Sequence, residues 1–181
     1  DPRMCAEAFQ RRGGNVLPVD GDHFTAPGQF VEPFRISEAA EQARRHLVAV
    51  DVQDPGNAGS ILRTAAAAGV THVYLSQHCA FAWAPKVLRA GMGAHFALDL
   101  IEGLAASDLQ ALRVPLLAAN AHAAQALHNA VLPFPCAWVF GHEGQGIDRA
   151  LAAQCRMTLS IPQPGGEESL NVAAAAAICL Y

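Results

Sequence analysis

The stretch LVAVDVQDPGNAGSILRTAAAA, residues 47–68, contains the pattern of a strand, a turn and a helix in immediate succession. Its apolar, β-rich start, Leu47–Val52, predicts a buried strand. The tripeptide Asp-Pro-Gly at 54–56 ends that strand, and the Ala-rich run Ala58–Ala68 predicts a helix. Asn57 stands where a helix N-cap is expected. The stretch therefore predicts a strand that is followed directly by a helix.

The same alternation continues along the chain. Further strands are predicted at His72–Ser76, His95–Asp99, Pro115–Ala119, Cys136–Phe140 and Met157–Ile161. Further helices are predicted at Pro85–Gly91, Ala105–Arg113, Ala121–His128 and Asp148–Gln154, with a last one after Ser169. This pattern favours an α/β fold, a parallel sheet with helices on both faces. Ligands of such sheets bind outside the carboxyl ends of the strands, where Asp51–Ser60, Asn120, Gly141–Gly146 and Pro162–Ser169 fall.

The composition fits one globular domain. Of 181 residues, 52% are hydrophobic and 15% charged, which excludes disorder as the general state. The apolar run Val172–Tyr181 is shorter than the roughly 20 residues of a membrane-spanning helix, so we expect a soluble protein. No signal peptide is apparent. A formal net charge of −4 gives no general sign of nucleic-acid binding, so any RNA or DNA site must be local.

The five cysteines are scattered, with no C-x-x-C pair and no histidine at ligand spacing. We therefore expect no disulfide framework, no metal site and a reducing, cytoplasmic environment. Residues 1–46 are rich in turn and linker residues, with a short polar helix predicted at Ser37–Arg45. This segment is too small to fold alone, so we expect an arm or linker.

Three segments carry side chains suited to chemistry. In the first, Arg63 lies in a helix that is apolar nearly all round, so we expect it to be buried beside an anionic or polar partner. A solvated arginine on an exposed stripe is the alternative. The second segment, FGHEGQGID at 140–148, places Glu143 among three glycines that let a ligand approach the backbone. A tight turn also explains the glycines, but it does not explain the carboxylate.

The third segment runs from Ile161 to Asn171 and contains two prolines and two glycines. We expect Ser169 to cap the Ala-rich helix that follows, and Asn171 to lie in its first turn. The glycines of these segments match neither a dinucleotide fingerprint nor a P-loop.

Taken together, these segments resemble the three ordered motifs of the SpoU (TrmH-like) family of SPOUT RNA methyltransferases. The matching residues are Asn57-x-Gly59-x-x-x-Arg63-Thr64, Phe140-Gly141-x-Glu143-Gly144-x-Gly146, and Ile161-Pro162 through Ser169-Leu170-Asn171-Val172-Ala173. The stretch from Pro85 to Ala94 is also similar to the family. The resemblance covers residues 47–181, and it implies that 1–46 is the remnant of an upstream RNA-binding region.

Members of this family transfer a methyl group from S-adenosylmethionine to a ribose 2′-hydroxyl of tRNA or rRNA. The resemblance implies this activity and cofactor, a C-terminal trefoil knot and a homodimer, without a metal. The residues that match catalytic positions are Arg63, Asn57, Ser169, Asn171 and Glu143. Those implied to hold the cofactor are Ala119, Asn120, Gly141, Glu143, Gly146, Ile161, Ser169 and Leu170.

In the family the arginine activates the 2′-hydroxyl. Arginine stays protonated in proteins and is a poor base, so we expect Arg63 to be a fixed cation that stabilises the developing alkoxide. RNA contacts are expected from Arg63, Lys86 and Arg89, because the last two share one face of a helix.

Two other functions fit parts of the pattern. One is a catalytically inactive RNA-binding or cofactor-sensing protein on the same fold, which has no chemical need for Arg63, Asn57 and Ser169. The other is an unrelated doubly wound enzyme, which the missing nucleotide and hydrolase motifs disfavour.

Overall fold

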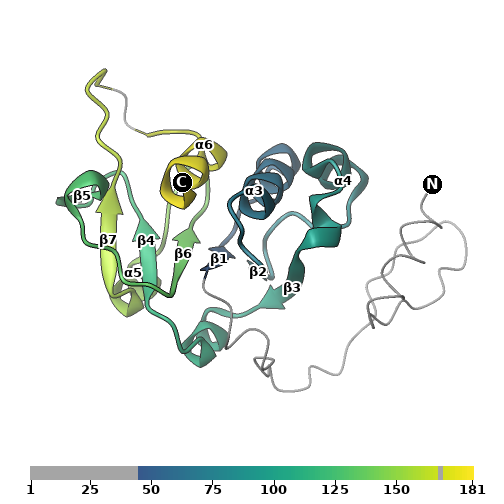
Figure 1. Cartoon of the computed structure of the whole chain (residues 1–181), viewed down its shortest axis with the longest axis horizontal. Coiled ribbons are helices and arrows are strands. Elements are labelled where there is room, and N and C mark those ends of the chain that lie inside the picture. Colours follow the sequence, from purple (N-terminus) through teal and green to yellow (C-terminus); the bar gives the residue numbers. More distant parts are fainter. Residues whose placement is uncertain (1–44, 167–168) are drawn as a thin grey trace, which may run out of the picture. The chain divides into compact units, whose positions relative to one another are not determined.

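The structure is a computed structural model that describes residues 45–166 and 169–181. Within them one seven-stranded sheet has the order β3-β2-β1-β6-β4-β7-β5, and each neighbouring pair is parallel (Figure 1). The strands are β1 (Arg45–Ala49), β2 (His72–Ser76), β3 (Asp99–Leu104), β4 (Leu116–Ala119), β5 (Gln125–Ala126), β6 (Cys136–Phe140) and β7 (Met157–Ser160). The predicted parallel sheet is confirmed.

The helices of the described chain are α3 (Pro55–Ala67), α4 (Pro85–Gly91), α5 (Arg149–Gln154) and α6 (Val172–Leu180). Short 3-10 helices are η1 (Ala94–Ala97), η2 (Ala106–Ala111) and η3 (Leu127–Asn129). Helix α3 packs between α4 and α6, and the three lie along one side of the sheet (Figure 1). None of the described helices has the length and apolar character needed to cross a membrane.

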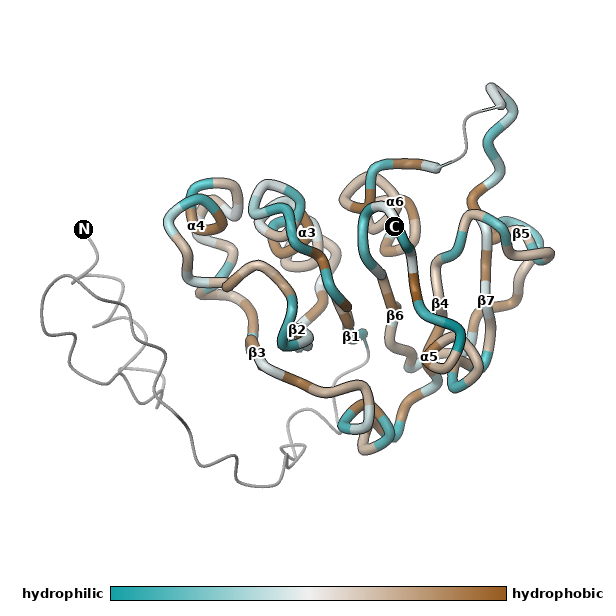
Figure 2. Tube along the Cα trace, turned by 180° about the vertical axis from the view of Figure 1, so that it is seen from behind, coloured by the Kyte–Doolittle hydropathy of each residue, from teal (hydrophilic) through white to brown (hydrophobic). Residues whose placement is uncertain are grey.

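Both faces of the central strands are buried, as predicted. Leu47 and Ala49 of β1 belong to the core beneath α3, while Val48 between them is also buried and faces the other way. On that second face Leu151 of α5 is fully buried. Figure 2 shows the apolar strands in brown, and the hydrophilic loops after β6 and β7 in teal.

The first strand differs from its prediction. It begins at Arg45 and ends at Ala49, whereas Leu47–Val52 was expected. Arg45 therefore does not end a helix, and the rest of the predicted helix Ser37–Arg45 lies outside the described residues. The Arg45 guanidinium donates to the carbonyls of Ala68 at 3.0 Å and Leu180 at 3.2 Å. These carbonyls are at the ends of α3 and α6, where a helix lacks internal partners and favours a cation.

The predicted strand His95–Asp99 is wrong. Residues 94–97 form η1, and β3 begins at Asp99. Met92 and Gly93 have φ angles of 49° and 87°, which turn the chain sharply after α4. His95 is then buried, and its Nε2 donates to the Ala82 carbonyl at 2.8 Å. This tertiary contact prevents the extended conformation that the sequence of this segment suggested.

Two predicted helices also differ. The segment Ala105–Arg113 contains the 3-10 helix η2 in place of an α-helix. The helix predicted over Ala121–His128 is absent from the described structure, where β5 pairs with β7 and η3 follows. Pairing at the sheet edge outweighs the helical preference of alanine here, because intrinsic propensity is a weak force.

Candidate active site

One residue from each of the three segments meets the others at the carboxyl edge of the sheet. Asn57 Nδ2, in α3, donates to Glu143 Oε1 at 3.2 Å. Asn171 Nδ2, at the start of α6, donates to Asn57 Oδ1 at 2.9 Å. We call these three residues the carboxylate–amide chain. Both atoms of the Asn57 amide are used, so this side chain links the loop after β6 to α6.

Glu143 is held by the backbone as well. Its carboxylate accepts from the amides of Gln53 at 3.3 Å and Asp54 at 3.0 Å. Burial acts to raise the pKa of Glu143, but the hydrogen bonds from Asp54, its own amide, Asn57 and Gln53 outweigh it and lower the pKa. Glu143 is therefore an ionised acceptor at neutral pH, suited to orienting donors and unsuited to donating a proton.

Asn57 is not the N-cap of α3, contrary to the prediction. Asp54 is the cap, and its Oδ1 accepts from the Asn57 amide at 2.7 Å. Pro55 occupies the first turn, where its missing N–H costs nothing. The site therefore depends on Asp54 and Gln53 as well, although neither was expected to hold Glu143. An aspartate directly before a proline at a helix start is the signal that identifies the cap.

Asn171, and not Ser169, caps α6. Its Oδ1 accepts from the amides of Ala173 at 2.9 Å and Ala174 at 3.3 Å. Asn171 thus fixes the start of α6 with one atom and joins Asn57 with the other. Ser169 is exposed and has no hydrogen bond to the carboxylate–amide chain within the described residues.

The glycine loop after β6 closes on itself. His142 and Gly146 exchange two backbone hydrogen bonds, of 3.0 and 2.8 Å. A Cβ on Gly141 would collide with the Gly146 carbonyl, and Gly146 has a φ of 70°. The turn therefore accounts for both glycines without a ligand, while it presents Glu143 to α3.

Arg63 is exposed, so its predicted burial is wrong. The buried face of α3 consists of small and aliphatic residues, and Arg63 lies outside it. Arg63 follows Asn57 by six residues, a rise of about 9 Å along the helix axis. Within the described residues it has no hydrogen bond or ion pair. Its guanidinium is available to a ligand from solvent.

The remaining predicted residues lie on loops and on α4. Ala119 ends β4, Asn120 follows it, and Ile161 follows β7. Because β4 lies between β6 and β7, the three loops predicted to hold a cofactor leave from adjacent strand ends. Leu170 precedes α6 and is exposed. Lys86 and Arg89 are both exposed on α4.

Comparison with known proteins identifies the matching family. The SpoU rRNA Methylase family model matches residues 44–181. An uncharacterised tRNA/rRNA methyltransferase of Synechocystis sp. is 38% identical over 148 residues, which cover 77% of this chain and 52% of that protein. The 23S rRNA (guanosine(2553)-2'-O)-methyltransferase RlmP of Bacillus subtilis is 36% identical over 147 residues, covering 80% of this chain and 59% of RlmP. The chain thus spans little more than half the length of these relatives.

A solved structure shows a similar fold. The SpoU methyltransferase AviRb from Streptomyces viridochromogenes, in complex with AdoMet, superimposes with a TM-score of 0.69 at 28% identity. The match covers 75% of this chain and 55% of AviRb.

Proposed function

The chain belongs to the SpoU rRNA Methylase family, and from this we propose that it transfers a methyl group from S-adenosylmethionine to a ribose 2′-hydroxyl of rRNA or tRNA. The carboxylate–amide chain carries the proposal, because it joins one residue from each family motif at a single point. The reaction named for RlmP and the cofactor named for the AviRb complex support it.

The residues at the sheet edge fit the cofactor. Gln163 Oε1, in the loop after β7, is buried and has no donor in the described chain. An orphaned amide oxygen of this kind suits an amino group of a nucleoside ligand. We propose that this loop, with Ala119, Asn120 and Gly141, holds the adenosine part. S-adenosylmethionine supplies an electrophilic methyl group when it is bound.

We propose that Arg63 acts on the reacting 2′-hydroxyl of the ribose. The guanidinium keeps its proton, so it acts as a fixed cation that stabilises the developing alkoxide. A phosphate of the RNA or a water molecule takes the hydroxyl proton. The carboxylate–amide chain positions the start of α3, and therefore the helix that carries Arg63, against the loops after β6 and β7.

Methyl transfer to rRNA and tRNA from a strain lacking the gene tests the proposal. Primer extension at low nucleotide concentration detects the 2′-O-methyl group. We expect Arg63→Ala to lower the rate by a factor of about 10² to 10³ while calorimetry shows unchanged cofactor binding. Rescue by Arg63→Lys would indicate that a positive charge is sufficient for catalysis, without the planar guanidinium and its paired N–H donors.

The matched control is Arg156→Ala. Arg156 is also exposed, but it precedes β7 and so lies at the opposite edge of the sheet. We expect full activity from this variant. A wild-type protein that binds S-adenosylmethionine but methylates neither RNA would instead indicate the inactive, cofactor-sensing alternative.

We further propose that the protein is a homodimer. Helix α6 is apolar throughout, Ile178 on it is 47% exposed, and Leu170, which precedes the helix, is exposed as well. A second copy can cover this surface. Light scattering at micromolar concentration is expected to give twice the 19.0 kDa chain mass. The trefoil knot of the C-terminal loops stays a prediction.

We also propose a cytoplasmic location. Cys79, Cys136, Cys155 and Cys179 are all unpaired, as in proteins of reducing compartments. Burial raises the pKa of Cys155 to about 11 and that of Cys179 to about 12, so both thiols are unreactive at neutral pH.

A further inference from the structure

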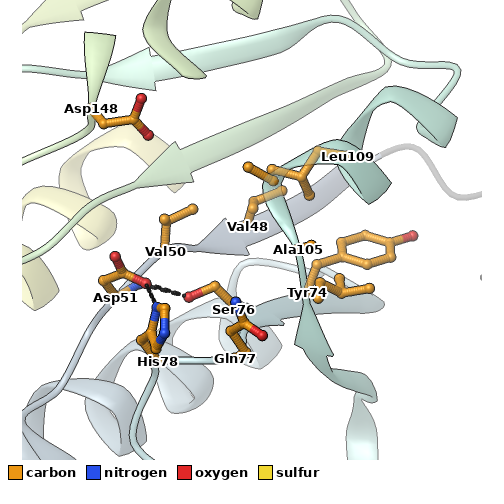
Figure 3. A pocket seen from close by; sticks show the side chains of 12 residues that line it. Val48, Val50, Asp51, Tyr74, Ser76, Gln77, His78, Ala105, Leu109 and Asp148 are labelled. Atoms are coloured by element: carbon orange, nitrogen blue, oxygen red, sulfur yellow. Dashed lines mark hydrogen bonds and ion pairs between the residues drawn. The ribbon is translucent and has the colours of Figure 1, made fainter. Parts of the chain in front are cut away.

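A pocket opens on the sheet face that is turned away from α3, at the carboxyl ends of β1, β2 and β3 (Figure 3). Its cavity volume is about 160 Å³. Val48, Val50, Leu104 and Leu109 form its apolar walls. None of its lining residues belongs to the loops at 119–120, 141–146 and 161–170, to which we assign the cofactor. The pocket is therefore a separate site.

Asp51 at the rim of this pocket has a strained backbone. Its φ is 56°, in the left-handed region that residues with a Cβ rarely adopt. Two hydrogen bonds hold it there: the Asp51 amide donates to Ser76 Oγ at 2.9 Å, and that hydroxyl donates to Asp51 Oδ1 at 2.7 Å. His78 Nδ1 lies 3.4 Å from the same carboxylate oxygen. Strain that the surroundings maintain at a pocket rim points to a functional role.

The second carboxylate oxygen is available to a ligand. Asp51 Oδ2 has no donor in the part of the chain that the structure describes, and the Asp51 side chain is 41% exposed. Figure 3 shows Asp51 bonded to Ser76 and His78 at the mouth of the pocket, with Asp148 across it. None of the lining residues within the described ranges is a lysine or an arginine. The carboxylates of Asp51 and Asp148 therefore disfavour a phosphate and favour a ligand that donates an N–H group.

An unpaired nucleobase has this chemistry. A flat ring can pack against the valines and leucines, and an exocyclic amino group can donate to the carboxylate. The pocket also lies beside the candidate active site. Asp51 precedes Gln53 and Asp54, whose amides bond to Glu143, by only two and three residues.

We propose that this pocket receives an unpaired, amino-bearing nucleobase of the substrate RNA, and that Asp51 Oδ2 accepts a hydrogen bond from its amino group. This inference rests on the proposed function, because the base belongs to the RNA that is methylated. It assigns to Asp51 a role in selecting the nucleotide. Uracil, which has no amino group, is the base that the pocket disfavours.

Nucleoside titrations of the full chain, followed by NMR, test the inference. Cytidine and uridine form the matched pair, because they differ in the amino group at position 4. We expect cytidine to shift the backbone amide signals of Asp51, Gln77 and His78, with an affinity roughly tenfold higher than that of uridine. Adenosine is likewise expected to bind with higher affinity than purine riboside, which lacks the amino group.

Asp51→Asn is the decisive variant. Asparagine tolerates a positive φ and keeps an oxygen for the Ser76 hydroxyl, so the local fold is expected to survive. Its NH₂ group cannot accept from an amino group, so the preference for cytidine is expected to disappear. Asp99→Asn is the control, because Asp99 is an exposed carboxylate that pairs with His72 outside the pocket. Ala106→Trp fills the pocket without changing Asp51 and is expected to abolish the shifts.

The outcomes separate this inference from the proposed function. Equal binding of cytidine and uridine, or no shift of the pocket amides by either at about ten millimolar, overturns the base pocket even if the protein methylates RNA. Failure of the wild-type protein to bind S-adenosylmethionine and to methylate RNA overturns the proposed function. Discrimination that persists in Asp51→Asn also overturns the inference, because another group must then read the base.

Discussion

At the scale of single residues, the two contacts of Asn57 require an amide at this position. Its Nδ2 donates to the ionised Glu143, and its Oδ1 accepts from Asn171. A carboxylate at position 57 could serve Asn171 but would face Glu143 with a like charge. A serine is too short to reach both neighbours. Asparagine supplies a donor and an acceptor in one planar group.

We therefore predict that Asn57→Asp lowers methyl transfer by about 10²-fold at pH 8. Two carboxylates in contact raise the pKa of one of them, so a proton is shared as the pH falls. The defect is expected to be smaller at pH 5.5, because the protonated carboxyl can donate to Glu143. Single-turnover rates with saturating S-adenosylmethionine measure this, with Asn129→Asp on the exposed helix η3 as the control. A defect of the same size at both pH values would contradict the model of the contact.

At the scale of elements, the close approach of α3 and α4 depends on Gly59. A Cβ built at this position meets Ala90 Cβ at 2.5 Å and the Val87 carbonyl at 2.6 Å. The same Cβ would lie 2.9 Å from the Gly91 amide nitrogen of α4. The two helices pack almost backbone to backbone, which places Lys86 and Arg89 beside the helix that carries Arg63.

Gly59→Ala is predicted to destabilise the protein by about 1–3 kcal/mol, the usual cost of overpacking a tight contact. Helix propensity alone predicts the opposite, because alanine is favoured over glycine by about 1 kcal/mol within a helix. Urea unfolding shows whether the substitution raises or lowers the free energy of unfolding. Ser60→Ala, at the next position of α3, is the control and is expected to change stability little. A more stable Gly59→Ala protein would show that the helices can separate without cost.

At the scale of the whole molecule, two neighbouring helices carry positive charges and no negative ones. The segments of α3 and α4 contain Arg63, Lys86 and Arg89 and no acidic residue, although the chain has a net charge of −4. An RNA backbone is therefore attracted to this pair of helices more than to the molecule at large.

Replacing Lys86 and Arg89 together by alanine is predicted to weaken RNA binding about equally for different sequences. Phosphate contacts position the RNA without reading its bases. The slope of log affinity against log salt is expected to fall by about 1.5, since two contacts are lost. Filter binding over a salt series measures the slope, and Arg149→Ala with Arg156→Ala is the control pair. An unchanged slope would place the RNA elsewhere.

The stability of the folded chain is predicted to fall as the pH drops below about 6.5, the ordinary pKa of histidine. Burial lowers the pKa of His72, and the nearby Asp99 carboxylate offsets part of this shift. Burial also lowers the pKa of His95, and its hydrogen bond to the Ala82 carbonyl offsets part of that shift. In this range the unfolded chain binds more protons than the folded one, so acid favours unfolding.

The slope is at most about 1.4 kcal/mol per pH unit for each histidine. Urea unfolding between pH 8 and pH 5.5 measures it. His95→Gln keeps a donor for the Ala82 carbonyl and is expected to flatten the slope, whatever its effect on stability at pH 8. A slope as steep as that of the wild type would show that His95 does not contribute.

Local sequence was sufficient for elements with strong patterns at both ends. The strands His72–Ser76 and Cys136–Phe140 and the helix Pro85–Gly91 have their predicted bounds. In each case the residues favour one type of secondary structure, and the residues on either side end that element. The strand predicted at His95–Asp99 and the helix at Ala121–His128 failed, because burial of one histidine and pairing at a sheet edge depend on distant segments.

For the candidate site too, local sequence decided some features and the tertiary structure decided others. Local sequence singled out Glu143 as a carboxylate among glycines, and it placed Asn57 and Asn171 only at helix starts. The resemblance to the SpoU family implied the chemical roles of the two asparagines. Only the tertiary structure brought them together, since Asn57 is 86 residues from Glu143 and 114 residues from Asn171. It also showed that Asp54 caps α3, that Asn171 caps α6 and that Arg63 is exposed. Hydrogen bonds reach about 3 Å, so which groups form them depends on how the whole sheet places its strand ends.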